Sequence, residues 1–305
     1  MVNLSVVIPT RDRWPALEET LAALSGQRVH GTWEVVVVDN GSSDETVART
    51  RDVASRFPVP LKVLSEPRSG PAAARNTGTR AAMGDLILYT GDDTAPADAE
   101  TIGRHLDLHR AHPEPTYVVL GRATWRTDKP ITPLMDWLEH GGTQFQFHRL
   151  SAGPVAIDRY FYTPNVSLKR SLWVATGGFD ERFPYAAIED TELGLRLAEA
   201  RATLDYHPEI VVLHDHPTEL SSSLRRMVRV GQSAALFHSI HPDADDAGLP
   251  ARPAGPKWCL IRRAAGPARR IDRPGVPARV RRRAWEIQHM AAYADGFTLG
   301  PPDRD

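Results

Sequence analysis

Two groups of acidic residues follow apolar runs that are typical of buried strands. Asp39 ends a run of four valines, where its carboxylate can accept a hydrogen bond from the ring N–H of a uracil or a guanine. The alternative for Asp39 is a turn residue that binds its own backbone. Asp92 and Asp93 are adjacent after a second apolar run, and neighbouring like charges are costly unless a cation neutralises them. A hard divalent ion that also holds a diphosphate would do so, and a solvated Asp-Asp pair is the simpler alternative.

A third acidic pair, Glu189-Asp190, opens a segment whose leucines predict the inner face of a helix. These leucines are Leu193, Leu195 and Leu197. The N-terminus of a helix carries partial positive charge, which keeps Asp190 ionised and suits a general base. The alternative is that the pair serves only as an N-cap and a first-turn acid.

Strands and helices that alternate through the first 120 residues must position these side chains. Strands are expected at 4–8, 33–38, 61–64, 86–89 and 117–120, and helices at 15–24, 46–57, 71–83 and 97–111. Ser42 and Glu45 have capping-box spacing before the second helix. This pattern predicts an α/β fold with a doubly wound, mostly parallel sheet. Ligands bind such sheets at the carboxyl ends of the strands, so Pro9-Thr10-Arg11, Asp39 and Gly91-Asp92-Asp93 are expected at one edge.

The second half of the chain is less regular. Residues 127–162 have no clear period, and order returns with strands at 165–168 and 210–213 and helices at 170–175 and 190–200. Residues 252–283 hold eleven Lys or Arg against one acid, a net charge of +10, and five prolines. We expect one domain over 1–240, with a nucleotide-binding half (1–120) and an acceptor half (121–240). Residues 241–305 are expected to form a basic, Pro-rich extension without a second core, in which the prolines prevent a continuous amphipathic helix.

Seven segments, in this order, resemble family 2 glycosyltransferases of the GT-A fold. They are LSVVIPTRDR, EVVVVDNGSSDET, SGPAAARNTG, GDLILYTGDD, NVSLKR, GGFDERF and EDTELGLRL. The resemblance covers about residues 3–240. It implies a GT-A nucleotide-diphospho-sugar transferase.

The resemblance also implies a role for each matching position. The implied nucleotide-sugar contacts are Pro9, Thr10, Arg11, Asp39, Arg75, Asp92 and Asn165. Asp93 is implied as the direct metal ligand and Asp190 as the catalytic base, with Glu189 orienting a sugar. Two positions depart from the family pattern. Gly91 stands where the metal motif often has a third aspartate, and Ala186-Ala187-Ile188 replaces a stretch that usually contains an aromatic residue.

His214 and His216 end a predicted strand. In many family members a histidine here completes the metal site, and imidazole binds manganese as well as zinc. The alternative is a structural histidine. The implied cofactor is Mn²⁺ or Mg²⁺, with Asp93 and His214 as the ligands.

The predicted function is an inverting, metal-dependent glycosyltransferase that moves a sugar from a nucleotide-diphosphate sugar to an acceptor hydroxyl. A UDP-sugar is favoured, with GDP- or dTDP-sugars as alternatives, and the acceptor is a small molecule, a glycan or a lipid-linked molecule. A nucleotidyltransferase is the rival enzyme, but Pro9-Thr10-Arg11 lacks the glycine cluster of a phosphate loop. A non-catalytic sugar-nucleotide-binding protein is the third alternative, and it needs no Glu189-Asp190 pair.

Composition excludes other classes of protein. The chain has 305 residues, is 25% charged, and has a formal net charge of −1, so bulk charge predicts no nucleic-acid partner. One cysteine, Cys259, excludes a disulfide framework. No signal peptide or membrane span is predicted, so we expect a cytoplasmic protein. The basic extension can hold it at a membrane surface, or else Trp258 and Trp285 pack on the catalytic domain and the arginines pair with acidic groups.

Overall fold

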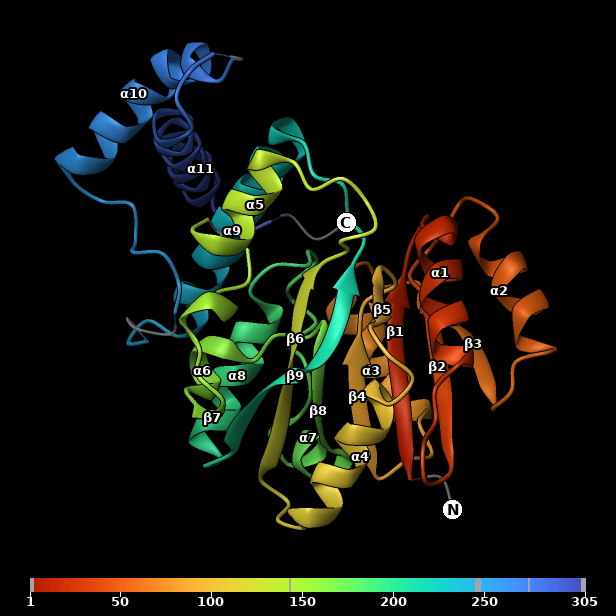
Figure 1. Ribbon diagram of the computed structural model, residues 1–305. Coiled ribbons are helices and arrows are strands. Elements are labelled where there is room, and N and C mark those ends of the chain that lie inside the picture. Colours follow the sequence, from red (N-terminus) through yellow and green to blue (C-terminus); the bar gives the residue numbers. More distant parts are fainter. Residues whose placement is uncertain (1–2, 143, 245–247, 274, 303–305) are drawn as a thin grey trace. The chain divides into compact units, whose positions relative to one another are not determined.

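The computed structural model describes residues 3–142, 144–244, 248–273 and 275–302 (Figure 1). The chain divides into two compact units. The first is Met1–Lys129 with Arg149–His216, and the second is Pro130–His148 with Pro217–Asp305. The second unit therefore takes in residues that the sequence analysis assigned to the acceptor half.

The first unit is built on one sheet. Its strands are β1 (Leu4–Thr10), β2 (Trp33–Asp39), β3 (Leu61–Ser65), β4 (Leu86–Thr90), β5 (Thr94–Pro96), β6 (Tyr117–Trp125), β7 (Gly153–Val155), β8 (Asn165–Lys169) and β9 (Thr203–His214). They are ordered β3-β2-β1-β4-β8-β6-β9-β5, with β7 on β9. The strands β3, β2, β1 and β4 are parallel, and β8 runs antiparallel to both β4 and β6. The predicted α/β sheet is confirmed.

The strand register brings the expected residues to one edge of this sheet. Thr10 at the end of β1 pairs with Asp39 at the end of β2. Because β8 is antiparallel to β4, its first residue Asn165 pairs with Thr90 at the end of β4. Figure 1 shows these strand ends on the same side of the sheet. This edge is the place where the candidate chemistry is found.

Most helices of the first unit contact strands of the sheet. The helices of this unit are α1 (Trp14–Ser25), α2 (Thr46–Ala54), α3 (Pro71–Ala81), α4 (Thr101–Ala111), α6 (Ile157–Tyr160), α7 (Arg170–Thr176) and α8 (Glu189–Glu199). In α1 the buried Leu17, Leu21 and Leu24 follow helical spacing, and all seven residues of β2 are buried. The capping box predicted before α2 is wrong: the Oγ of Ser42 instead accepts a hydrogen bond from the backbone N–H of Asp12.

The second unit is helical and has its own core. Its helices are α5 (Pro133–His140), α9 (Leu220–Ile240), α10 (Pro256–Ile271) and α11 (Ala278–Leu299), and a 3₁₀ turn at Phe147–Arg149 precedes the return to the sheet. Leu134, Trp137, Leu138 and Trp285 form one buried cluster. The expected absence of a second core is therefore wrong.

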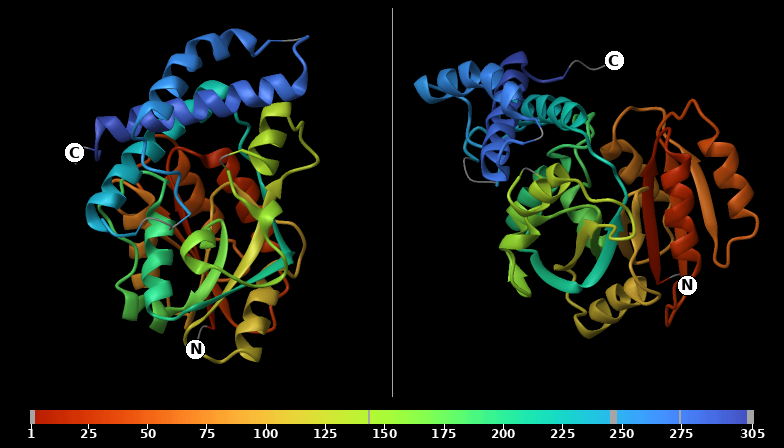
Figure 2. Two further views of the ribbon diagram at one scale, coloured as in Figure 1. Left: turned by 90° about the vertical axis from the view of Figure 1, so that its left-hand side faces the viewer. Right: turned by 45° about the horizontal axis from the view of Figure 1, so that its top comes forward.

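Helix α11 is the centre of this second unit, packing against both α9 and α10 (Figure 2). At Gly296 the backbones come so close that a Cβ would lie 1.9 Å from the carbonyl oxygen of Val228 on α9. The basic segment forms no continuous helix, as predicted, because α10 ends at Ile271 and α11 begins at Ala278 after Pro277; Pro267 alone does not interrupt α10. In the part of the chain that the structure describes, no helix has the length and apolar character of a bilayer span.

Candidate active site

Asp92 is anchored at the carboxyl edge of the sheet by two threonines. The Oγ1 of Thr10 donates to Asp92 Oδ2 at 2.9 Å, and the Oγ1 of Thr20 donates to the Asp92 carbonyl at 2.9 Å. Asp92 is buried. Burial, together with the charge of Asp93, raises the pKa of Asp92 above its usual value. A cation or a protonated ligand group near this carboxylate would therefore be stabilised.

Asp93 is surrounded by nitrogen atoms. Its Oδ2 lies 2.7 Å from Arg13 Nη2, 3.3 Å from His214 Nε2 and 3.7 Å from His216 Nδ1. Burial pushes the pKa of Asp93 upward, but the charges and hydrogen bonds of His214 and Arg13 outweigh it and hold the pKa below its usual value. The ring of His214 is stacked on Trp125, with 4.8 Å between the centroids. Asp93 is therefore an ionised carboxylate beside an oriented imidazole.

These residues fit a divalent ion that is completed by its substrate. Across the described ranges, no group of three or more His, Cys, Asp or Glu side chains could hold a metal by itself. Asp93 Oδ2 and His214 Nε2 nevertheless face each other at 3.3 Å. Mg²⁺ and similar ions are commonly bound by one or two carboxylates together with substrate phosphate oxygens. Two protein ligands plus a diphosphate match that pattern.

Asp39 is a turn residue at this edge of the sheet. This agrees with the alternative prediction that its carboxylate binds the backbone of its own turn. Its carboxylate accepts hydrogen bonds from the backbone N–H groups of Ser42 at 3.1 Å and Gly41 at 3.3 Å. Asp39 is buried. Its contact with a nucleobase stays a prediction. Arg11, expected beside it, has an exposed side chain that lies 3.8 Å from Asp12.

Arg75 and Glu189 form a buried ion pair. Arg75 Nη1 donates to Glu189 Oε1 at 2.7 Å, and the guanidinium lies over the ring of Phe179. Within the described residues, Arg75 Nε and Glu189 Oε2 have no hydrogen-bond partner. The pair ties α3 to the start of α8, and each member keeps a polar atom that a bound ligand could satisfy.

Asp190 lies in the first turn of α8, half-buried, two residues after a strained residue. Ile188 has φ = 72°, a left-handed conformation that is unfavourable for a β-branched side chain. Its carbonyl accepts from the N–H of Glu192 at 2.8 Å, and Asp190 Oδ1 accepts from the N–H of Thr191 at 2.9 Å. Strain of this kind persists only where the surroundings fix it, and it is concentrated at functional sites.

Asn165 is part of a buried polar chain. Its Nδ2 donates to the carbonyls of Ile210 and Arg122, so its Oδ1 accepts from His105 Nε2 at 2.9 Å. Gly121 is required beside it, because a Cβ there would lie 2.1 Å from Asn165 Nδ2. The amide thus joins β8 to β6 and β9, and its contact with a sugar stays a prediction.

Arg13 and His105 are site residues that the sequence analysis missed. Arg13 follows Arg11 in the same loop, and which of the two meets the carboxylates depends on the turn at Asp12, which has φ = 51°. The only sequence signal was the basic character of the loop. His105 lies inside a helical stripe and shows no motif.

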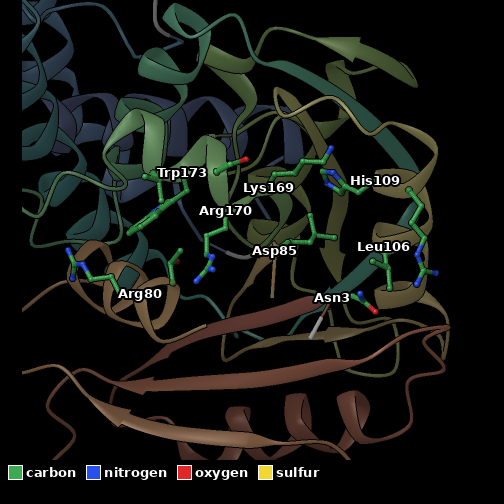
Figure 3. Close-up of a pocket in the computed structure, with 13 residues that line it drawn as sticks. Asn3, Arg80, Asp85, Leu106, His109, Lys169, Arg170 and Trp173 are labelled. Atoms are coloured by element: carbon green, nitrogen blue, oxygen red, sulfur yellow. The ribbon is translucent and has the colours of Figure 1, made fainter. Parts of the chain in front are cut away.

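A separate cavity of about 740 Å³ lies at the opposite edge of the sheet, where β1 and β4 begin (Figure 3). Its lining includes Asn3, Asp85, Lys169 and Trp173, which Figure 3 labels. The ammonium group of Lys169 is bound within the protein, because its Nζ donates hydrogen bonds to the carbonyls of His112 and Glu114, just after α4. The cavity therefore takes no part in the chemistry at Asp92 and Asp93.

Comparison with protein families decides the class of this site. The model of glycosyl transferase family 2 matches residues 5–162, more than half of the chain. The chain belongs to glycosyltransferase family 2. Membership of this family favours the predicted glycosyltransferase over the rival prediction of a nucleotidyltransferase.

Two curated relatives are similar over most of this family 2 chain. The pre-mycofactocin glycosyltransferase of Mycobacterium tuberculosis is 31% identical over 79% of this chain and 48% of its own length. The validoxylamine A glucosyltransferase of Streptomyces hygroscopicus subsp. jinggangensis is 32% identical over 64% of this chain and 51% of its own. The chain thus spans about half the length of these relatives.

Solved structures confirm the GT-A fold. The mannosyltransferase PcManGT of Pyrobaculum calidifontis, in complex with GDP-Man and Mn²⁺, has a TM-score of 0.62 at 20% identity, covering 97% of this chain and 86% of that one. TarS of S. aureus (residues 1–349), in complex with UDP-GlcNAc, has a TM-score of 0.58 at 18% identity and covers 99% and 93%. At these identities the likeness shows the fold alone.

Proposed function

We propose that this family 2 enzyme is an inverting, metal-dependent transferase that moves a sugar from a nucleotide-diphosphate sugar to an acceptor hydroxyl. The observation that carries the proposal is the arrangement at Asp93. An ionised carboxylate faces His214 Nε2 at 3.3 Å, at the edge of the sheet where nucleotides bind in α/β folds. That arrangement gives a divalent ion two protein ligands, and phosphate oxygens of the donor can fill further coordination positions.

Asp93 and His214 would hold Mn²⁺ or Mg²⁺, which when bound neutralises charge on the leaving diphosphate. Thr10 and Thr20 fix the carboxylate and the carbonyl of Asp92, and this positions Asp93, the next residue in the chain. In the same proposal Pro9, Arg11 and Asp39 contact the nucleoside.

Asp190 is the proposed general base. As the acceptor oxygen forms its bond to the anomeric carbon, the acceptor proton passes to the Asp190 carboxylate. The bond from the anomeric carbon to the diphosphate oxygen breaks on the opposite face, and its electron pair leaves with the diphosphate. A single displacement of this kind inverts the anomeric configuration. Arg75 holds Glu189 beside this base, where Glu189 and Asn165 are proposed to orient the sugar.

The donor is proposed to be a UDP-sugar, with GDP- and dTDP-sugars as alternatives. Support for the class comes from the structural neighbours, one of which binds GDP-Man and another UDP-GlcNAc. The acceptor is a small molecule, a glycan or a lipid-linked molecule.

A donor panel tests this function. UDP-, GDP- and dTDP-sugars are added to the purified chain with Mn²⁺ or with EDTA, and release of the nucleoside diphosphate is followed by ³¹P NMR. We expect release with one nucleotide class, dependent on the metal, and a product whose anomeric proton coupling reports inversion. A product of retained configuration would contradict the single displacement.

Contact with a membrane surface is a further proposal for the second unit. In the described ranges, five exposed cations of α10 and its flank have no ion pair or hydrogen bond through their side chains: Lys257, Arg263, Arg269, Arg270 and Arg273. Trp258 and Trp285, in contrast, are buried within the unit, and Arg282 pairs with Asp136. Binding to anionic vesicles that is lost at high salt would support the contact, and equal binding to neutral vesicles would contradict it.

A further inference from the structure

Arg13 lies among the residues proposed to hold the metal. Its Nη2 donates to Asp93 Oδ2 at 2.7 Å and lies 2.8 Å from His216 Nδ1, while its Nε is 3.5 Å from Asp92 Oδ1. The side chain is 34% exposed, so solvent and ligands can reach it. One guanidinium thus balances both carboxylates of the aspartate pair.

A divalent ion that binds Asp93 Oδ2 would compete with Arg13 for this oxygen. A hard ion lies roughly 2.1 Å from its carboxylate oxygen, and Arg13 Nη2 already lies 2.7 Å from Asp93 Oδ2. A guanidinium does not lose its proton in proteins, so two cations at the same oxygen would repel each other. Metal binding at Oδ2 therefore favours a position of the Arg13 side chain farther from Asp93.

The donor diphosphate offers Arg13 a new partner. A guanidinium pairs with phosphate oxygens through two parallel N–H···O bonds. Arg13 directly precedes α1 and is held at its backbone N–H, which donates to Thr46 Oγ1 at 3.2 Å. The backbone therefore stays anchored while the long, partly exposed side chain is free to turn.

We infer that Arg13 is a displaceable counter-cation, which neutralises Asp92 and Asp93 before the donor binds and moves to the diphosphate when the metal takes its place. The inference rests on the proposed metal-dependent function. Metal binding and donor binding then depend on each other. A metal that binds alone displaces Arg13 from the aspartates and leaves it without a new anionic partner. When a diphosphate binds together with the metal, its phosphate oxygens replace the aspartates as the partner of Arg13. By linkage, each ligand raises the affinity for the other by the same factor.

The test is direct binding to the full chain, without turnover. Mn²⁺ binding is measured from the EPR signal of free Mn²⁺, and UDP binding by calorimetry with and without Mn²⁺. Relative to the wild type, we expect Arg13→Met to bind Mn²⁺ alone about tenfold more tightly, and UDP in the presence of Mn²⁺ about tenfold more weakly. Arg104→Met is the matched control, because the Arg104 side chain is 35% exposed and also pairs with an aspartate, Asp98 at 2.8 Å, and neither affinity should change.

If Arg13→Met does not fold, the melting temperature of a second variant tests the same role of Arg13. Arg13→Gln is also neutral and retains hydrogen-bond donors. In EDTA it should melt at a lower temperature than the wild type, and Mn²⁺ should raise its melting temperature by more than that of the wild type. Equal Mn²⁺ affinities and equal metal-induced shifts for variant and wild type would overturn the inference.

The Asp93→Asn variant separates the two proposals. If Asp93→Asn abolishes Mn²⁺ binding but the Arg13 variants bind Mn²⁺ as the wild type does, the metal site is right and the role of Arg13 is wrong. If Asp93→Asn binds Mn²⁺ as tightly as the wild type, the metal site itself is wrong, and the inference about Arg13 fails with it.

Discussion

Arg75 on α3 donates a 2.7 Å hydrogen bond to Glu189 at the start of α8, and both side chains are buried. The two residues are 114 positions apart in the chain. The pair therefore fixes the segment that carries Asp190 to the helix that follows β3 in the same unit. The position of the proposed base depends on this contact.

Removal of one member of the pair should be costly. Arg75→Met leaves the Glu189 carboxylate buried without its partner, so we expect the free energy of unfolding to fall by about 3 kcal/mol or more. Urea unfolding followed by circular dichroism measures it. Arg75→Met with Glu189→Gln should recover part of the loss, and a double variant with no recovery would contradict a direct pair.

Stability should also fall at acid pH because of His105. Burial lowers the pKa of His105 to about 4, so it stays neutral in the folded protein. In the unfolded chain a histidine takes up a proton near pH 6.5. As the pH falls from 7 to 5, only the unfolded state gains this proton, and the folded state loses about 2 kcal/mol of stability.

His105→Gln isolates this contribution. The difference in unfolding free energy between pH 7 and pH 5 should be smaller in the variant than in the wild type by about 2 kcal/mol. His109 is present in both proteins, so its contribution to the pH dependence of the unfolding free energy cancels in the comparison. Parallel pH dependence in the two proteins would show that folding does not lower the pKa of His105.

The core of the second unit predicts a different effect. Trp285 is 2% exposed, and its ring lies 5.7 Å from that of Trp137. Trp285→Ala should destabilise the unit by about 3 kcal/mol or more. Leu260→Ala is the control on α10, because Leu260 is 65% exposed and should leave the melting temperature unchanged. Equal melting temperatures for the two variants would contradict the packing described.

Strands with continuous apolar runs were predictable from the sequence. The valines of β2 and the position of Asp39 at its end were found because a buried parallel strand needs apolar residues on both faces. By contrast, β9 begins at Thr203, well before the predicted 210, because its first half alternates polar residues such as Asp205 and His207. The three-residue β5 is too short to show any period, and α4 begins at Thr101 rather than at 97.

The contacts within the site were less predictable than its location. The motifs placed Asp92, Asp93 and Asp190 on the right elements, since loops that follow parallel strands share an edge. They did not show that Arg13 rather than Arg11 meets the carboxylates, or that Arg75 binds Glu189. Those contacts depend on side-chain direction and on segments far apart in the chain, neither of which a single sequence encodes as a local pattern.

The Asp190→Asn variant shows whether Asp190 acts as the general base of sugar transfer. This change keeps the shape of the side chain and removes the proton acceptor. With the donor found in the panel, we expect its affinity, measured by calorimetry, to stay within about twofold of the wild type, while kcat for transfer falls by roughly two to four orders of magnitude. A variant that binds donor normally and transfers sugar at a rate near that of the wild type would contradict the role of Asp190 as the base. The base would then be another residue.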